Sequence, residues 1–290
     1  MISIHSILSI ALKSSNLTSL EAEVLLAHVL SVSRVYLRAW HEKTVTEQQK
    51  QAFESLVSRR YAGEPLAYLV GAKEFWSLPL VISKSVLIPR PETECLVELV
   101  LNNTGCKDRA SVPVQGIRAL DLGTGSGAIA LALAVERPHW KIIGVDRSLA
   151  ALEIATLNAK NNQIDNVEFI KSDWFSCFEV DKTRFDIIVG NPPYIHPNDS
   201  HLEGDIRYEP KEALISFPDG LQDLKKIILE APKYLVSKGW LFLEHGFDQG
   251  VFVKKSMELA GFTDVKTYKD VADLSRVTVG RRVEKKHKMI

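Results

Sequence analysis

Four consecutive residues carry the functional groups needed to hold an amide or amine nitrogen during a reaction. They are Asn191, Pro192, Pro193 and Tyr194, and they follow an apolar run at 185–189 that predicts a buried strand. Such a nitrogen shares its lone pair with a π-system and therefore attacks a methyl group poorly. The Asn191 side-chain oxygen and the Pro192 carbonyl can accept from its two N–H groups and turn the lone pair toward the methyl carbon. The motif is therefore suited to methyl transfer, with Asn191, Pro192 and Tyr194 as catalytic residues.

The two prolines make this loop stiff. Proline has a fixed φ and no N–H, so the carbonyls of Pro192 and Pro193 stay free to face a ligand. Proline also keeps the preceding Asn191 in extended geometry. Tyr194 can lay its ring on the planar target group, so that positioning carries most of the catalysis. We predict that residues 191–194 bind the substrate; the alternative is a proline-rich turn with Asn191 as a local cap.

A glycine-rich loop follows another short apolar run upstream. Gly123, Gly125 and Gly127 allow a tight turn with close approach of the backbone to a ligand. The following helix directs its N-terminal amides into that turn, and Asp146 ends the next apolar run, where it can accept from ribose hydroxyls. The loop therefore predicts a nucleoside cofactor. We predict that the cofactor is bound by Asp121, Gly123, Thr124, Gly125, Ser126, Gly127, Asp146, Asp173, Trp174 and Asn191.

Two features favour S-adenosylmethionine as this cofactor, with S-adenosylhomocysteine as its product. Asp121 precedes the first glycine by two positions, where its carboxylate can meet the ammonium group or a bridging water of a methionine moiety. Asp173 can accept from the adenine amino group while Trp174 covers the ring, although a capping Asp beside a core Trp is an alternative. The spacing from Gly123 to Ala128 also satisfies the loose dinucleotide fingerprint. A nicotinamide dehydrogenase and a glycine turn without a ligand therefore remain alternatives.

The elements that must position these loops change in character along the chain. Residues 1–72 predict a small helical bundle without strands, with capping boxes at 18–21 and 44–47. Residues 73–90 predict a β-hairpin connector. Residues 91–290 alternate strands with helices, which predicts an α/β domain with a mainly parallel sheet covered on both faces. The strands are expected near 117–121, 141–145, 167–170, 185–189, 239–243, 262–268 and 275–281.

Composition argues against several classes of function. The chain has 36 basic and 36 acidic residues, so no overall field attracts nucleic acid. Cys95, Cys106 and Cys177 are too scattered for a disulfide framework, and we predict no metal site. The first residues lack the features of a secretory signal, and no apolar run approaches the ~20 residues of a membrane span. We therefore expect a soluble, cytoplasmic protein that acts as a monomer.

Three further stretches, together with the two loops, resemble the HemK/PrmC family, the S-adenosylmethionine-dependent methyltransferases of peptide-chain release factors. The stretches lie at 64–75, 86–94 and 208–221. The run Pro-Arg-Pro-Glu-Thr-Glu at 89–94 is highly specific in combination, whereas the glycine loop is common to many methyltransferases. The resemblance covers nearly the whole chain.

The resemblance implies N5-methylation of the glutamine side chain in the Gly-Gly-Gln motif of class I release factors. It implies that residues 123–127, Asp146 and Trp174 bind the cofactor and that residues 191–194 bind the glutamine. The family fold is a class I, Rossmann-like methyltransferase domain with a mainly parallel seven-stranded sheet, joined by a hairpin to a small N-terminal helical bundle. That bundle is expected to recognise the substrate protein.

Three features leave the prediction open in detail. Arg90 and Glu92 can form a structural ion pair that pins the connector, or they can serve the site. Asp-Leu-Ser-Arg at 273–276 stands where the family usually carries a Gly-Arg-Asp-Arg-like turn, which puts the last hairpin in doubt. The polar stretch 102–116 predicts a surface loop, and the basic tail 281–288 predicts a solvated end or a contact with RNA or an acidic partner.

Other substrates also match the reaction loop. Asn-Pro-Pro-Tyr resembles the signature of adenine-N6 DNA methyltransferases, because their target nitrogen poses the same chemical problem. Those enzymes must flip a base and bind a polyanion, yet this chain shows no basic face and no obvious target-recognition insertion. Glutamine methylation of a ribosomal protein and a non-catalytic adaptor with the same fold are the remaining alternatives.

Overall fold

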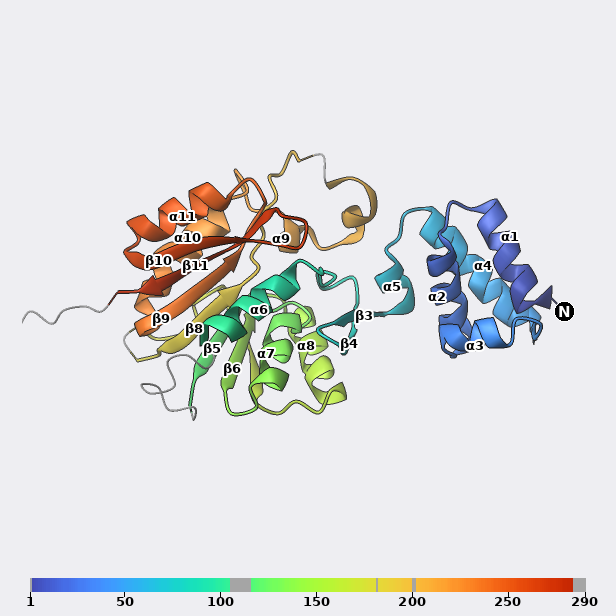
Figure 1. Cartoon of the computed structure of the whole chain (residues 1–290), viewed down its shortest axis with the longest axis horizontal. Coiled ribbons are helices and arrows are strands. Elements are labelled where there is room, and N and C mark those ends of the chain that lie inside the picture. The colour runs from blue at the N-terminus through green and yellow to red at the C-terminus, as the bar shows by residue number, and fades with distance from the viewer. Residues whose placement is uncertain (1, 105–115, 181, 200–201, 284–290) are drawn as a thin grey trace, which may run out of the picture. The chain divides into compact units, whose positions relative to one another are not determined.

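The chain folds into two compact units (Figure 1). The computed structural model describes residues 2–104, 116–180, 182–199 and 202–283. The N-terminal unit comprises Met1–Ala72 and His201–Tyr208, and the sheet unit comprises Lys73–Ser200 and Glu209–Ile290. Most of the loop predicted at 102–116 and of the basic tail lies outside the described residues. No helix in the described part of the chain has the length and apolar character that crossing a membrane requires.

Helices form most of the N-terminal unit, and a side chain caps the N-terminus of each of the first four. They are α1 (Ile4–Ser14), α2 (Ser19–Leu30), α3 (Arg34–Ala39), α4 (Glu47–Tyr61), α5 (Leu66–Val70) and the 3-10 helix η2 (Gly204–Tyr208). Thr18 and Glu21 form the predicted capping box of α2. The second box lies two residues later than predicted, at Thr46 and Gln49, because Thr44 is extended in a strand.

That strand corrects the prediction of a bundle without strands. β1 (Ile2–Ser3) and β2 (Thr44–Val45) pair in an antiparallel arrangement, with Ile2 opposite Val45. Each strand has two residues, which is too short to produce a detectable alternation of apolar and polar positions. The short pair leaves Val45 2% exposed in the core of the unit.

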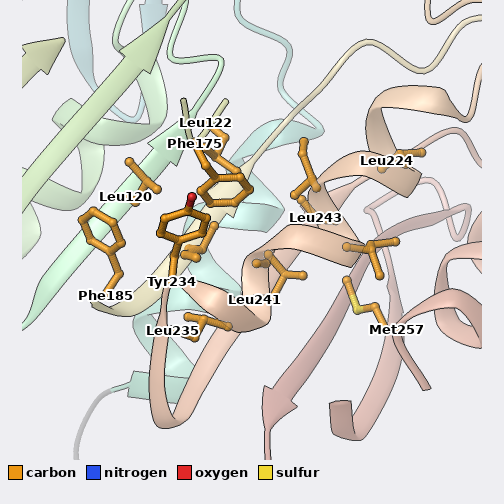
Figure 2. Packing of buried hydrophobic residues seen from close by; sticks show 14 of the residues in the cluster. Leu120, Leu122, Phe175, Phe185, Leu224, Tyr234, Leu235, Leu241, Leu243 and Met257 are labelled. Atoms are coloured by element: carbon orange, nitrogen blue, oxygen red, sulfur yellow. The ribbon is translucent and has the colours of Figure 1, made fainter. Parts of the chain in front are cut away.

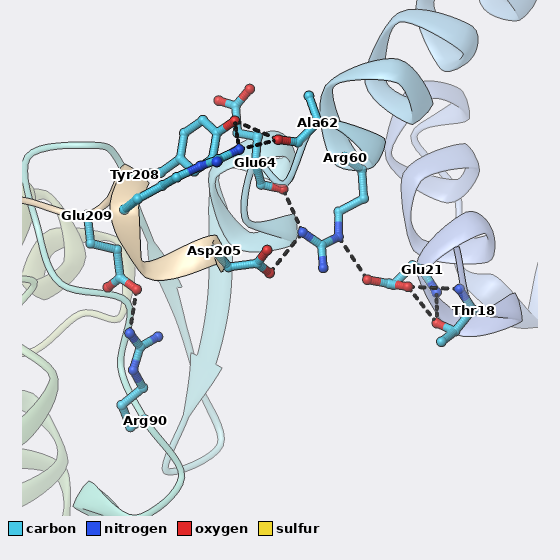
Figure 3. A network of polar contacts seen from close by, with 10 residues as sticks. Thr18, Glu21, Arg60, Ala62, Glu64, Arg90, Asp205, Tyr208 and Glu209 are labelled. Carbon is cyan, nitrogen blue, oxygen red and sulfur yellow. Dashed lines mark hydrogen bonds and ion pairs between the residues drawn. The ribbon is translucent and has the colours of Figure 1, made fainter. Parts of the chain in front are cut away.

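Arg60 joins three elements within the N-terminal unit (Figure 3). Its guanidinium lies 2.8 Å from a carboxylate oxygen of Glu21 on α2 and 2.8 Å from one of Asp205 on η2. It also donates to the carbonyl of Glu64 at 3.1 Å. Because η2 lies far along the chain from α2 and α4, this ion-pair network helps to hold a distant segment in the N-terminal unit.

The predicted connector forms a hairpin of β3 (Ala72–Phe75) and β4 (Leu78–Val81). The buried Asn158 lies on α8 (Leu149–Asn161). The oxygen and the nitrogen of its side-chain amide both hydrogen-bond to the backbone of Val81. Its oxygen accepts from the Val81 N–H at 2.7 Å, and its nitrogen donates to the Val81 carbonyl at 3.1 Å. The same nitrogen donates to the Ser126 carbonyl at 2.9 Å. One asparagine therefore connects the hairpin to the glycine loop.

A seven-stranded sheet forms the centre of the sheet unit. The strands are β5 (Arg118–Leu122), β6 (Lys141–Asp146), β7 (Val167–Lys171), β8 (Phe185–Gly190), β9 (Leu235–Glu244), β10 (Phe262–Lys269) and β11 (Ser275–Arg282). Their order is β10-β11-β9-β8-β5-β6-β7. The pairs from β9 to β7 are parallel, and β11 is antiparallel to both of its neighbours. This confirms the predicted class I fold.

Helices cover both faces of this sheet (Figure 1). They are α6 (Thr93–Thr104), α7 (Ala128–Glu136), α8, α9 (Lys211–Leu214), α10 (Gln222–Glu230), α11 (Gly250–Leu259) and the 3-10 helix η3 (Ala231–Lys233). On one face, Leu120 and Leu122 of β5 and Leu241 of β9 form a core with Leu224 of α10 and Met257 of α11 (Figure 2). Because a one-residue slip would turn these leucines out of the core, burial sets the register of the strands.

Candidate active site

The parallel register brings the ends of four strands to one edge of the sheet. Leu122 of β5 pairs with Val145 of β6 and with Gly190 of β8, and Gly190 pairs in turn with Leu243 of β9. The residue that follows each of these therefore lies in one row. The row consists of Glu244, Asn191, Gly123 and Asp146. The two predicted loops thus meet at the carboxyl edge, where open α/β sheets bind their ligands.

The glycine loop is a tight turn held by backbone hydrogen bonds, most of them to the neighbouring strand β6. The N–H groups of Gly123 and Thr124 both donate to the Val145 carbonyl at 2.9 Å, and the Gly127 N–H donates to the Thr124 carbonyl at 2.8 Å. Gly123, Gly125 and Gly127 have φ angles of 72°, 54° and 83°. This left-handed region strains residues with a side chain, so the turn requires glycine at these positions.

Asp121 lies at the end of β5 and is 1% exposed. Its Oδ2 accepts from the Thr124 hydroxyl at 2.7 Å, whereas Oδ1 has no hydrogen-bonding partner within the described residues. Burial raises the pKa of Asp121 to about 7; the Thr124 hydroxyl and the nearby Ala130 N–H lower it, and the charge of Asp146 raises it. A buried carboxylate oxygen without a partner is costly, so this position is suited to a cationic ligand group.

Asp146 holds the glycine loop from the neighbouring strand. Its Oδ2 accepts from the Gly125 N–H at 3.0 Å, and its Oδ1 accepts from the Ser148 N–H at 2.9 Å. Each carboxylate oxygen can accept a second hydrogen bond. Asp146 can therefore support the loop and still accept from a ligand hydroxyl.

The two residues predicted to hold an adenine ring differ in their surroundings. The Trp174 ring lies against the glycine loop, where a Cβ added to Gly123 would be 3.3 Å from the ring. The Asp173 carboxylate is 60% exposed and forms an ion pair with Lys226 at 3.0 Å. The structure therefore brings Trp174 to the loop, and it gives the Asp173 carboxylate a partner at the surface.

Backbone contacts with distant segments hold the reaction loop (residues 191–194). The Ile195 N–H donates to the Leu214 carbonyl at 2.9 Å, which anchors the end of the loop on α9. The side chain of Gln249, between β9 and α11, donates to the Tyr194 carbonyl at 2.8 Å. The path of the loop therefore depends on residues that follow it by many positions in the chain.

Two further residues hold the polar side chains of the reaction loop. The Asn191 side-chain nitrogen donates to the hydroxyl of Thr93, at the start of α6, at 3.3 Å. This bond does not use the Asn191 oxygen, which is the atom predicted to accept from the substrate. The Tyr194 hydroxyl donates to Oε1 of Glu244 at 3.3 Å. Thr93 and Glu244 thus orient the side chains that carry the predicted chemistry.

Glu244 is the second buried carboxyl at this edge. It is 1% exposed, and its Oε2 has no hydrogen-bonding partner within the described residues. Burial raises the pKa of Glu244 to about 7, although the Thr93 hydroxyl and Arg276 both lower it. Burial and the charge of Glu244 also raise the pKa of Tyr194 well above its usual range. Tyr194 therefore keeps its proton near neutral pH and can donate a hydrogen bond.

Arg90 forms an ion pair with Glu209 (Figure 3), and not with Glu92. Glu209 is 5% exposed and also accepts from the Ile88 N–H at 3.0 Å. One carboxylate therefore holds both the side chain and the backbone of the segment that leads into α6. The predicted ion pair between Arg90 and Glu92 is therefore wrong, because Arg90 takes its partner from another part of the chain.

The last hairpin forms although its turn departs from the family pattern. β10 and β11 pair, and Asp273 in the turn has a φ of 61°. Arg276 donates to the Asp270 carboxylate at 3.1 Å and to the His245 carbonyl at 3.4 Å. The turn thereby places a guanidinium close enough to influence the pKa values of Glu244 and Tyr194.

No role was predicted from the sequence for Thr93, Glu244 or Gln249. Thr93 belongs to the stretch 86–94 that carries the family resemblance, but no local pattern shows its contact with Asn191. Glu244 ends an apolar run, and such a position in a parallel sheet is a signal that could have identified it. Gln249 is a polar residue before a helix and offers no comparable signal.

Comparisons with known families and folds agree with this geometry. A model described as a PrmC N-terminal domain matches residues 8–71, and a model described as a methyltransferase domain matches residues 113–273. The crystal structure of a methyltransferase from Pyrococcus furiosus is similar to this chain with a TM-score of 0.51 at 19% identity. The similarity covers 78% of this chain and 98% of that one, and it concerns the fold alone.

Curated relatives are much more similar in sequence. A release factor glutamine methyltransferase from Aliivibrio fischeri is 48% identical over 280 residues, which is 96% of this chain and 95% of the relative. The release factor glutamine methyltransferase of Escherichia coli is 47% identical over 271 residues, or 93% and 94% of the two chains. Both similarities extend through the N-terminal unit and the sheet unit. The chain therefore belongs to the release factor glutamine methyltransferase family.

Proposed function

We propose that this enzyme transfers a methyl group from S-adenosylmethionine to the side-chain nitrogen, N5, of the glutamine in the Gly-Gly-Gln motif of class I peptide-chain release factors. Membership of the family supports both the reaction and the substrate. The observation that carries the proposal is the row in which Asn191 lies next to Gly123. A loop suited to an amide nitrogen is thereby placed beside a loop suited to a nucleoside cofactor.

The residues at this edge fit S-adenosylmethionine. The unpartnered Oδ1 of Asp121 suits the ammonium group of its methionine part, and Asp146 retains acceptor capacity for ribose hydroxyls. We propose that these two residues, the loop at 123–127 and the ring of Trp174 hold the cofactor. Asp173 pairs with Lys226 through Oδ2 alone and retains acceptor capacity for the adenine amino group. The bound cofactor supplies a methyl group on a positively charged sulfur.

The reaction loop is proposed to hold the target amide. The Asn191 side-chain oxygen and the Pro192 carbonyl accept from its two N–H groups, while the Tyr194 ring lies against its plane. Pro193 stiffens the loop, because its φ is fixed. These contacts fix the approach of the nitrogen, so most of the rate enhancement comes from positioning. No strong base is needed, since a nitrogen that has gained a methyl group becomes acidic and loses its proton to water.

We also propose that the N-terminal unit recognises the release factor and that the enzyme acts as a monomer. The N-terminal unit has a hydrophobic core of its own, which supports a role as a separate recognition module. Because release factors act on ribosomes, the proposal places the reaction in the cytoplasm. The zero formal net charge supports a protein substrate rather than nucleic acid.

The test uses radiolabelled S-adenosylmethionine with four acceptors in parallel. They are a class I release factor, the same factor with its motif glutamine changed to alanine, a ribosomal protein mixture and duplex DNA. Label on the unchanged release factor alone is the expected result. Label on DNA or on ribosomal protein instead would keep the chemistry of the reaction loop and refute the proposed substrate.

A further inference from the structure

Glu244 contacts the reaction loop without belonging to the residues proposed to touch substrate or cofactor. Its Oε1 accepts from the Tyr194 hydroxyl at 3.3 Å, and the Thr93 hydroxyl lies close enough to its carboxyl group to lower its pKa. Thr93 in turn accepts from the Asn191 side-chain nitrogen at 3.3 Å. A single buried carboxyl is therefore linked to both side chains that are proposed to hold the glutamine.

We propose that Glu244 is a positioning residue for methyl transfer, which orients Tyr194 directly and Asn191 through Thr93. The inference rests on the proposed function of the reaction loop. Burying a carboxyl group is costly, and an apolar side chain of similar size would avoid the cost. Glu244 nevertheless ends a strand at 1% exposure with one oxygen unpartnered. Such burial does not serve stability, and it is explained if the carboxyl serves the loop beside it.

Charged groups on two elements influence the pKa of Glu244. Arg276 on β11 favours its ionised form, and Glu92, which precedes α6, opposes it. Arg276 is itself paired with Asp270 at 3.1 Å. The other titratable neighbours are Tyr194 in the reaction loop and Cys95 on α6.

The protonation state of Glu244 changes the strength of its hold on the loop. Burial raises its pKa to about 7, with Thr93, Arg276 and Tyr194 acting in the opposite direction. An ionised carboxylate accepts hydrogen bonds more strongly than a neutral carboxyl group. The hydrogen bond from Tyr194 therefore tightens, and the attraction of the Thr93 hydroxyl grows, as the pH rises through about 7. We expect the rate of methyl transfer to rise over the same interval.

The test replaces Glu244 by glutamine, which keeps the size of the side chain and cannot ionise. The single-turnover rate of release factor methylation is measured from pH 6 to 9 at saturating S-adenosylmethionine. Saturation removes any effect of Asp121 on cofactor binding. For Glu244→Gln we expect a rate about tenfold lower at pH 8, the effect of about one charge-assisted hydrogen bond. We also expect loss of the rise near pH 7 and an affinity for S-adenosylhomocysteine within about twofold of wild type.

Two further variants separate positioning from a purely structural role. Tyr194→Phe removes the contact between Glu244 and Tyr194, and Thr93→Val removes the contact between Glu244 and Thr93. When either variant is combined with Glu244→Gln, the methylation rate should fall by less than the product of the two separate effects. If Glu244→Gln does not fold, the combined Tyr194→Phe and Thr93→Val variant must lose the rise near pH 7. Glu168→Gln, at an exposed position on β7, is the control and should match wild type.

The inference is overturned if Glu244→Gln keeps the wild-type rate and pH profile. It is equally overturned if the variant loses thermal stability and S-adenosylhomocysteine affinity but keeps the rise near pH 7, because that result describes a structural role. Absence of release factor methylation by the wild-type enzyme would instead refute the proposed function. The two failures are thus distinguishable.

Discussion

Replacement of Asp121 by asparagine should abolish the pH dependence of cofactor binding. The Asp121 carboxyl is 1% exposed, and we propose that its unpartnered Oδ1 meets the ammonium group of the cofactor. Burial raises the pKa of this carboxyl to about 7. Only the ionised carboxylate attracts an ammonium group. Binding below pH 7 must therefore remove a proton from Asp121.

The size of the effect follows from that pKa. At pH 5, two units below it, about 1% of the carboxyls are ionised, and at pH 7 about half are. The affinity for S-adenosylhomocysteine, which has the same ammonium group, should therefore rise about 50-fold between pH 5 and 7. Once the pH exceeds the pKa of its own amino group, the ligand loses the ammonium proton and the affinity should fall again. Asp121→Asn should bind about 10–100-fold more weakly at pH 7 and show no rise.

Isothermal titration calorimetry with S-adenosylhomocysteine provides the assay. Titrations at fixed ionic strength, in two buffers of different ionisation enthalpy, count the protons released on binding. Well below pH 7 the wild-type enzyme should release nearly one proton per ligand from Asp121, and Asp121→Asn should release none. The exposed Asp165→Asn variant is the control and should match wild type. A wild-type affinity that stays constant from pH 5 to 7 would refute the reasoning.

The buried carboxyls of Asp121 and Glu244 should not unfold the protein in acid, so they should not disturb the titrations between pH 5 and 7. The pKa values of Asp121 and Glu244 are both about 7 in the folded chain, above the ordinary values of 3.8 and 4.5. The folded state therefore binds more protons than the unfolded state between about pH 4 and 7. Their contribution to stability is full below about pH 4 and is lost as the pH rises through 7.

Three further substitutions test other parts of the structure. Asn191→Ala should lower turnover roughly 10²-fold and leave S-adenosylhomocysteine affinity nearly intact; loss of affinity at an unchanged rate would contradict its role. Asp146→Ala should raise the dissociation constant of S-adenosylhomocysteine roughly tenfold, and an unchanged value in calorimetry would remove Asp146 from the site. Arg60→Ala should lower the free energy of unfolding of the N-terminal unit by about 2 kcal/mol, because it leaves two carboxylates without their partner. Lys50→Ala, which breaks the exposed ion pair of Lys50 with Glu47, is the control for Arg60→Ala. By calorimetry it should lower the free energy of unfolding by less than about 0.5 kcal/mol.

Local patterns were sufficient to predict the class of fold. The central strands of the sheet contain short apolar runs, since both faces of the sheet are covered there, and each of the seven strands lies within a few residues of its predicted range. The two-residue strands β1 and β2 were missed because they are too short to show the alternation of apolar and polar residues that indicates a strand. The second capping box was placed two residues too early, since Thr44 and Thr46 offer the same side-chain chemistry and only pairing of the strand distinguishes them.

The loops of the candidate site were predictable for a related reason. The conformations of the glycine loop and of the two prolines depend mainly on the residues themselves, because glycine permits positive φ and proline fixes φ. Their convergence also followed from sequence, since parallel strands present their carboxyl ends at one edge. The surface ion pair of Asp173 with Lys226 is different, because nothing near Asp173 in the sequence indicates that partner.

By itself, then, the sequence determined the α/β fold, the two loops and the type of chemistry they can perform. Only the tertiary structure decided which side chains hold those loops in place. Glu244 meets Tyr194, Arg90 meets Glu209, and Arg60 meets Asp205, each across a long separation in the chain. Such pairs depend on strand register and on the packing of whole elements, so no local pattern encodes them. The pKa values near 7 of Asp121 and Glu244 have the same origin, because burial exists only in the folded chain.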